Sequence, residues 1–132
     1  MRYSYYIGRQ PAAGTQNLNQ HHIMRKIESD MVAAIRSRQN YRNGNTVVDQ
    51  ADPENGYGEV RLFGNRIARF NYVNGIIEFE DAGYRTAKTK SRLNALIGAF
   101  TKPGQGIYQR DFDWYWQDGQ EWDGSALAKL LI

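Results

Sequence analysis

The sequence predicts an α+β fold in which an antiparallel sheet packs against two helices. Two segments, 17–40 and 89–100, place apolar residues three and four positions apart, which is the spacing of one buried helix face. Between them, segment 46–80 alternates apolar with polar residues and contains Asn74-Gly75, a dipeptide typical of tight β-hairpin turns. A chain of 132 residues is long enough for one hydrophobic core and too short for two. Residues 1–132 are therefore expected to form a single domain.

The composition excludes several kinds of site. The chain has no cysteine, which rules out disulfides, thiolate zinc sites and cysteine nucleophiles. Its two histidines, His21 and His22, are adjacent and would point about 100° apart on a helix, so we expect surface or capping roles for them. No apolar run approaches the roughly 20 residues that span a bilayer, and the N-terminus lacks a signal-peptide pattern. The expected protein is cytoplasmic and has neither a cofactor nor a membrane partner.

Charge is distributed unevenly along the chain. The net charge is +3, but residues 1–110 hold 16 Lys and Arg against 9 Asp and Glu, whereas residues 111–132 hold one lysine against five acids. Such a separation is typical either of a nucleic-acid surface beside an acidic edge or of two surfaces that attract each other within the fold. Both interpretations stay open at the level of the sequence.

The N-terminal third is expected to contain an arm and an amphipathic helix. Residues 1–16 combine a short β-like run with loop-forming Gly and Pro, which predicts an arm or an edge strand. In segment 17–40 the apolar residues share one face, and charged residues occupy the rest of the helical wheel. Asn43-Gly44 is a typical stop signal for such a helix.

The strands of segment 46–80 are expected to form a three-stranded meander. A two-residue turn at Asn74-Gly75 would place Phe70 opposite Phe79 and Arg69 opposite Glu80. For the preceding turn we predict a three-residue loop over residues 64–66, because a two-residue loop would mix the two faces of the sheet. The expected core face carries Val60, Leu62, Ala68, Phe70, Tyr72, Ile77 and Phe79, and the reverse face carries Glu59, Arg61, Arg69, Asn71, Glu78 and Glu80.

The C-terminal half is expected to contain a helix, a hairpin and one further element. Helix 89–100 would be capped by the hydroxyl of Thr86 or Thr89 and would end before Pro103-Gly104. Segment 107–123 alternates aromatic with polar residues and contains Asp118-Gly119, which predicts a second hairpin. Residues 125–132 fit either a short amphipathic helix or a last strand.

The least ordinary feature is a group of four cations around the start of the second helix: Arg85, Lys88, Lys90 and Arg92. A helix N-terminus is already positive because of its unpaired N–H groups and its dipole, so cations at this position favour a bound anion. Together with the hydroxyls of Thr86 and Thr89, the group suits a phosphate or a sugar-phosphate backbone. Alternatively, solvent, neighbouring acids or the acidic C-terminal hairpin neutralise these cations.

Two arginines on the reverse face of the meander, Arg61 and Arg69, extend this basic surface if the same face binds nucleic acid. The alternative is an ordinary solvated face that the C-terminal hairpin partly covers.

The aromatic and acidic residues of the C-terminal hairpin form a second group of candidates: Trp114, Trp116, Trp122, Asp111 and Asp113. Core and edge packing is the simplest interpretation, and a base-stacking platform or a protein-contact surface is the alternative. Metal-dependent nuclease chemistry would use Asp111 and Asp113, although two carboxylates on one side of a strand repel each other unless a cation neutralises them. The sequence contains no recognisable nucleophile with its base and no glycine-rich phosphate loop, so we expect a non-enzymatic protein.

Several segments together resemble a family of small uncharacterised proteins of tailed bacteriophages and their prophages. The resemblance rests on segments 60–68, 83–86, 89–96 and 107–109, followed by Trp114 and Trp116, and it covers roughly residues 45–118. It implies a phage or prophage origin, and hence the cytoplasm of a host cell, but no activity.

A weaker resemblance is architectural. The order of a helix, a three-stranded meander and a helix with a basic N-terminus is similar to that of double-stranded-RNA-binding domains. That similarity implies phosphate contacts from Lys88, Lys90 and Arg92.

These observations lead to a functional hypothesis with two rivals. The first hypothesis is a non-enzymatic phage or mobile-element accessory protein whose basic helix N-terminus binds the nucleic-acid backbone. The main rival is a phage inhibitor that binds a host enzyme or a defence complex, with the acidic hairpin as the contact. A metal-dependent nuclease is the third possibility. The sequence does not predict an oligomeric state.

Overall fold

The computed structural model describes residues 24–101 and 105–130. The predicted arm (residues 1–16), the first part of the predicted helix 17–40, both histidines and Pro103-Gly104 lie outside these ranges. The described elements are, in chain order, α1 (Lys26–Arg36), β1 (Tyr41–Asn43), β2 (Thr46–Asp52), a 3-10 turn η1 (Pro53–Asn55), β3 (Tyr57–Leu62), β4 (Asn65–Asn71), β5 (Ile76–Glu80), α2 (Ala87–Phe100), β6 (Ile107–Arg110), β7 (Asp113–Trp116) and β8 (Ser125–Lys129).

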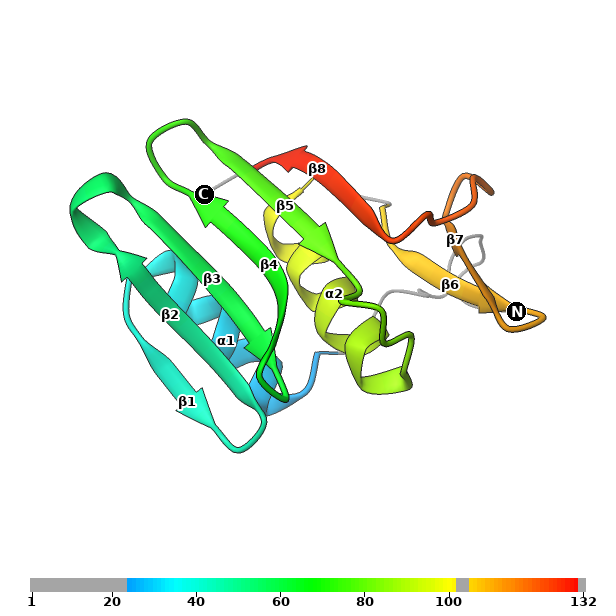
Figure 1. Ribbon diagram of the computed structural model, residues 1–132, viewed down its shortest axis with the longest axis horizontal. Coiled ribbons are helices and arrows are strands. Elements are labelled where there is room, and N and C mark those ends of the chain that lie inside the picture. Colours follow the sequence, from blue (N-terminus) through cyan, green and yellow to red (C-terminus); the bar gives the residue numbers. More distant parts are fainter. Residues whose placement is uncertain (1–23, 102–104, 131–132) are drawn as a thin grey trace, which may run out of the picture.

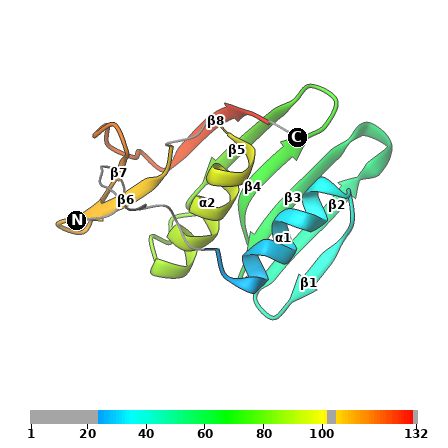
Figure 2. The same ribbon diagram turned by 180° about the vertical axis from the view of Figure 1, so that it is seen from behind.

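The molecule has two layers, and the predicted α+β class is confirmed. Six strands form an antiparallel sheet in the order β1-β2-β3-β4-β5-β8, and α1 and α2 cover one of its faces (Figures 1 and 2). The hairpin of β6 and β7 is a separate two-stranded sheet, which lies beyond α2 and the start of β8 (Figure 1). The predicted meander is the central part of a larger sheet, because β1 and β2 extend it on one side and β8 on the other.

The first helix is shorter than predicted at its C-terminal end. It ends at Arg36 in a Schellman motif, in which Gln39 N donates to Ala34 O (2.8 Å) and Arg38 N donates to Ile35 O (3.2 Å). Arg38 takes the left-handed conformation that a glycine usually supplies, with φ 56°. The predicted stop at Asn43-Gly44 is therefore wrong, and Gly44 (φ 58°) instead forms the turn between β1 and β2.

The turn between β3 and β4 also differs from the prediction. Phe63 and Gly64 form a two-residue turn with φ 53° and 81°, which pairs Leu62 with Asn65. A β-bulge then shifts the register, so that Val60 lies opposite Ala68. The bulge adds one residue on β4, and this restores the alternation of buried and exposed side chains that a two-residue loop alone would have broken. The predicted three-residue loop is therefore absent, although the predicted faces of the strands are kept.

The turn between β4 and β5 contains four residues rather than two. Asn71 pairs with Ile76, and the Asn71 side chain accepts hydrogen bonds from the backbone N–H groups of Val73 (2.8 Å) and Asn74 (3.0 Å). The predicted register is therefore wrong by two residues, and Arg69 lies opposite Glu78. A shift of two leaves every side chain on its predicted face.

The predicted core face is confirmed, and it receives the apolar faces of both helices. Tyr72 is half-buried, and its hydroxyl donates to Ile35 O at 2.6 Å. The fully buried large side chains are Met31, Ile35, Ile67, Phe70, Ile77, Phe79, Leu93, Leu96, Ile97, Phe100, Trp114 and Trp122.

The C-terminal half agrees with the prediction in its elements and differs in one turn. Thr86 caps α2, because its Oγ1 accepts a hydrogen bond from Thr89 N (3.1 Å). The predicted turn at Asp118-Gly119 is present, since Trp116 N donates to Gln120 O (2.8 Å) and Tyr115 forms an antiparallel bridge with Glu121. The chain also reverses at Asp111-Phe112, inside the segment predicted as one continuous strand, so that β6 and β7 pair with each other. The tail, for which the sequence leaves a helix or a strand open, forms strand β8 beside β5.

Candidate functional site

The four cations near the start of α2 do not form one exposed cluster. Arg92 is 3% exposed, and its guanidinium pairs with Glu28 Oε2 (2.8 Å) and donates to Thr46 Oγ1 (3.1 Å). Ser91 Oγ donates to the same carboxylate oxygen of Glu28 (2.5 Å). Arg92 therefore belongs to a buried polar network between α1, α2 and β2, and its assignment to a phosphate-binding surface is wrong.

Arg85 also has an acidic partner within the chain. Its Nε lies 3.0 Å from Asp81 Oδ2, and a second guanidinium nitrogen donates to Trp122 O (3.3 Å). Asp81 additionally accepts hydrogen bonds from Trp122 Nε1 (2.8 Å) and from Gly83 N (2.8 Å). Burial raises the pKa of Asp81, but these hydrogen bonds and the charge of Arg85 outweigh it, so the pKa lies below its ordinary value.

The two lysines differ in their surroundings. Lys90 Nζ donates to Gln109 Oε1 of the hairpin (3.3 Å), and partial burial lowers the pKa of Lys90. Lys88 is exposed and has no ion-pair partner within the part of the chain that the structure describes. The hydroxyls of Thr86 and Thr89 lie 2.9 Å apart and hydrogen-bond to each other in the helix cap.

The reverse face of the sheet carries matched charges. Arg61 pairs with Glu59 (2.8 Å), Arg66 pairs with Glu80 (3.1 Å), and Arg69 pairs with Glu78 across the β4–β5 ladder. The hydrogen bond and charge of Glu78 raise the pKa of Arg69. Arg61 and Arg69 therefore lie in a band of alternating charge rather than in a continuous positive surface.

The tryptophans of the C-terminal region are core residues. Trp114 and Trp122 are fully buried, with ring centroids 6.4 Å apart, and the half-buried Trp116 lies 5.4 Å from Trp122. A base-stacking or protein-contact role for Trp114 and Trp122 is therefore wrong. The simpler interpretation, core packing, is the one that the structure supports.

The most exposed large apolar side chain of the described residues belongs to Phe112, which no sequence pattern singles out. Phe112 forms the β6–β7 turn together with Asp111, and its side chain is 89% exposed. Both residues have left-handed backbone conformations, with φ 53° for Asp111 and 74° for Phe112. This turn lies at one extremity of the molecule (Figure 1). The alternating pattern of segment 107–117 conceals the turn, because neither residue is a glycine or an asparagine.

The acidic residues beside Phe112 lie in the turn and in the first position of β7. Asp111 and Asp113 are both exposed, as are the other three acids of the C-terminal region, Asp118, Glu121 and Asp123. Within residues 24–101 and 105–130, no three His, Asp or Glu side chains are grouped so that they could hold a metal ion.

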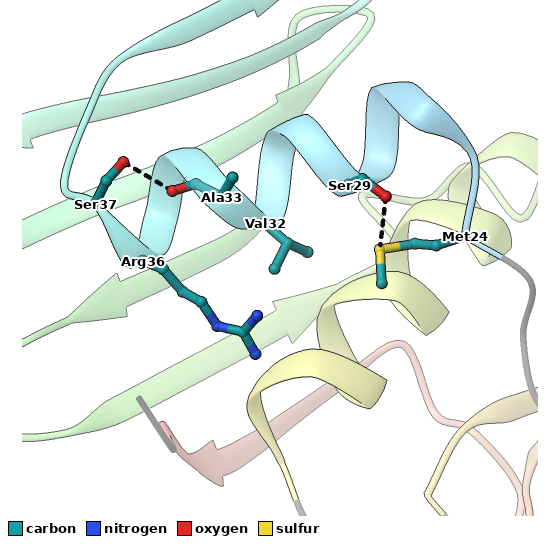
Figure 3. Close-up of a pocket in the computed structure, with 6 residues that line it drawn as sticks. All are labelled: Met24, Ser29, Val32, Ala33, Arg36 and Ser37. Carbon is teal, nitrogen blue, oxygen red and sulfur yellow. Dashed lines mark hydrogen bonds between the residues drawn. The ribbon is translucent and has the colours of Figure 1, made fainter.

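An open groove runs along α1 on the side that faces α2 (Figure 3). It is lined by Met24, Ser29, Val32, Ala33, Arg36 and Ser37. Of these residues only Arg36 is charged, and its guanidinium donates to Ala99 O (3.1 Å) and lies over the Phe100 ring. The groove thus presents no group that is poised for chemistry.

Comparisons with known proteins place the chain in a family. No curated protein and no solved structure matches it, and none of the described helices is long and apolar enough to cross a membrane. The Kyanoviridae Gp96 protein family matches residues 24–128, which include every described helix and nearly all of the last strand. The chain belongs to the Kyanoviridae Gp96 family of phage proteins.

Proposed function

We propose that this phage protein is a non-enzymatic accessory protein that binds a host protein, with the β6–β7 turn as the contact. The observation that carries the proposal is the position of Phe112, which is 89% exposed at the tip of a hairpin. A large aromatic side chain presented in this way is typical of the anchor residue of a protein interface, which fills a pocket on the partner.

Folding alone does not account for a phenylalanine at this position. A left-handed backbone conformation costs a residue other than glycine about 1–2 kcal/mol, and an asparagine or a glycine would fit the turn better. The side chain also gains little by burial within its own chain. Local strain together with a solvent-exposed apolar group favours a role in binding.

The base of the hairpin is firmly attached to the rest of the fold. The Asn94 side chain of α2 accepts from Ile107 N (2.7 Å) and donates to Ile107 O (2.9 Å). Lys90 and Gln109 add a second link to α2. A rigid support lowers the entropy lost on binding, which favours tight association.

The charges beside Phe112 indicate the kind of partner. Asp111 and Asp113 flank Phe112 in the sequence, are both exposed, and form no ion pair within the described ranges. The expected partner surface is an apolar pocket with a basic rim, because opposite charges around a hydrophobic centre speed association and exclude wrong partners. A host enzyme or a defence complex that itself binds nucleic acid offers such a surface.

The experiment is an affinity capture from host-cell lysate with Phe112→Gly and a matched control. Phe63→Gly is the control, because Phe63 is 64% exposed and lies in a turn with φ 53°. We expect a stoichiometric host protein that survives nuclease and high salt, is lost with Phe112→Gly, and is retained with Phe63→Gly. Equal capture by wild type and Phe112→Gly, or no captured protein, would overturn the proposal.

A second candidate function is binding of the nucleic-acid backbone by Lys88 and Lys90. The observation that favours it is the first turn of α2, which contains no acidic residue and includes the exposed Lys88. In a salt titration with duplex DNA and duplex RNA, the double variant Lys88→Gln/Lys90→Gln should reduce the slope of log K against log salt by up to about 2. An unchanged slope would rule this candidate out.

A further inference from the structure

Strand β8 forms an open edge of the main sheet. The strand order ends at β8, and β5 is its only neighbour among the described strands (Figure 1). Leu130 N donates to Gly75 O (2.7 Å), and Asp81 N donates to Gly124 O (3.0 Å). Because antiparallel partners alternate between hydrogen-bonded and non-hydrogen-bonded pairs, the even-numbered residues of β8 bond to β5. The backbone groups of Ser125, Leu127 and Lys129 therefore point outward.

This edge lacks the usual protection against pairing. Strand β8 reads Ser-Ala-Leu-Ala-Lys, with no proline and with one charged residue at its end. The opposite edge, β1, is three residues long and carries Arg42 at its centre, so it is blunted by its length and its charge. An open backbone edge of five residues is a site for strand addition.

An apolar surface accompanies the open edge. Leu127 is 69% exposed on the face of the sheet opposite the helices, where it pairs with Glu78. Ile76, which is 39% exposed, lies diagonally beside it on β5. A strand added to β8 would cover part of this surface and would satisfy the outward N–H and C=O groups, which face no other strand of residues 24–101 and 105–130.

We propose that a second copy of the chain occupies this edge, with β8 pairing antiparallel to β8 about a two-fold axis at Leu127. In this register Leu127 lies opposite Leu127 of the second copy, and Ser125 lies opposite Lys129. The sequence of β8 suits such an arrangement, because its alanines flank the central leucine symmetrically and its lysine faces a serine rather than another lysine. The two main sheets then form one continuous sheet.

The absence of cysteine from the chain allows a direct test of this geometry. Residues in a hydrogen-bonded antiparallel pair have Cα atoms about 5.5 Å apart, which lies within the range of a disulfide. Leu127→Cys should therefore form an intermolecular disulfide under mild oxidation. Val73→Cys is the control, because Val73 is 79% exposed but lies in the β4–β5 turn and not on β8. Equal cross-linking of the two variants would contradict the proposal.

Sedimentation velocity over a range of concentrations supplies the second measurement. The wild type should show a monomer–dimer equilibrium, and Leu127→Lys should raise the dimer dissociation constant at least tenfold, because it places two like charges at the two-fold axis. Val73→Lys should leave that constant unchanged. A wild type that stays monomeric at every concentration, or a Leu127→Lys variant that dimerises like the wild type, would overturn the proposal.

A proline variant separates loss of pairing from loss of folding. The N–H of Leu127 points to the open edge, so Leu127→Pro removes no hydrogen bond to β5, and the far-UV circular dichroism should match that of the wild type. The dimer should nevertheless be lost. Phe112→Gly should leave the dimer intact, so the outcome is independent of the function proposed for the hairpin. A dimer that persists in a folded Leu127→Pro variant would overturn the proposal.

Discussion

At the scale of single residues, the main discrepancy with the sequence concerns which charges are buried. Glu28 lies on the same helical stripe as Met31, Val32 and Ile35, at steps of three, four and seven residues. That spacing was a signal that this carboxylate faces the core, and a buried carboxylate requires a partner. Arg92 is such a partner. The sequence predicted a phosphate-binding role for it instead, because a cation near a helix N-terminus is usually exposed.

The buried pair predicts a large difference between two nearby cations. Arg92→Met should lower the free energy of unfolding by about 3–5 kcal/mol, because it removes the guanidinium charge that lies 2.8 Å from the buried Glu28 carboxylate. Lys88→Gln, four residues away and exposed, should change it by less than about 0.5 kcal/mol. Urea denaturation of both variants measures the difference. Similar values for the two would show that the pair does not form.

Asp81 gives the protein a pH dependence with a defined sign. Its folded-state pKa lies below the unfolded value of about 3.9, so its contribution to stability is present above that value and is lost as the pH falls through the folded pKa. Asp81→Asn should cost about 1–3 kcal/mol near pH 7 through the loss of charge-assisted hydrogen bonds to Arg85 and Trp122. Denaturation measured from pH 7 downward, through the folded-state pKa of Asp81, should show the two proteins converging in acid. A constant difference would contradict this assignment.

At the scale of elements, the sequence predicted which segments form helices and strands better than it predicted where they turn. The spacing of apolar residues along the chain reflects which side chains are buried, and both helices and the meander follow the expected spacing. The turns depend on residues with positive φ, and several of these are neither glycine nor asparagine: Arg38, Phe63, Asp111 and Phe112. Arginine and phenylalanine rarely adopt positive φ, so no local pattern in the sequence predicts the turns that contain them.

The packing of the sheet predicts opposite effects for two glycine substitutions. A Cβ on Gly58 would lie 2.5 Å from the Phe70 ring and 3.0 Å from Asp49 O, so Gly58→Ala should destabilise the protein by about 1–3 kcal/mol. Gly98 is exposed on α2 with open space around it, and Gly98→Ala should stabilise the protein by about 0.5–1 kcal/mol. Thermal and urea denaturation test both. Destabilisation by Gly98→Ala would mean that this part of α2 is packed differently.

At the scale of the whole molecule, several cations in the basic part of the sequence pair with acids of that same part, whereas the five acids of the C-terminal part stay exposed. Residues 24–101 and 105–130 contain 14 Lys and Arg and 14 Asp and Glu, so the net charge of +3 comes from the remaining residues. Several cations that the sequence assigned to an external anion have carboxylate partners, among them Arg61, Arg69, Arg85 and Arg92. Composition could not reveal this, because it counts charges without their positions. Arg92 reaches an acid 64 residues away and Arg69 an acid on the neighbouring strand, whereas Arg61 and Arg85 pair with acids two and four residues away.

The two sheets should unfold as one unit, because α2 and the hairpin share buried contacts. All three tryptophans lie between residues 114 and 122, so fluorescence reports on the hairpin region, whereas far-UV circular dichroism reports mainly on the helices and the main sheet. In the wild type the two signals should give coincident urea transitions.

Asn94→Ala leaves both backbone groups of the buried Ile107 without their partner, which should cost about 1–3 kcal/mol and bring the fluorescence transition to lower urea. Gln109→Ala, which removes only the link to Lys90, should leave the transitions coincident. Separate transitions in the wild type would instead mean that the hairpin folds independently.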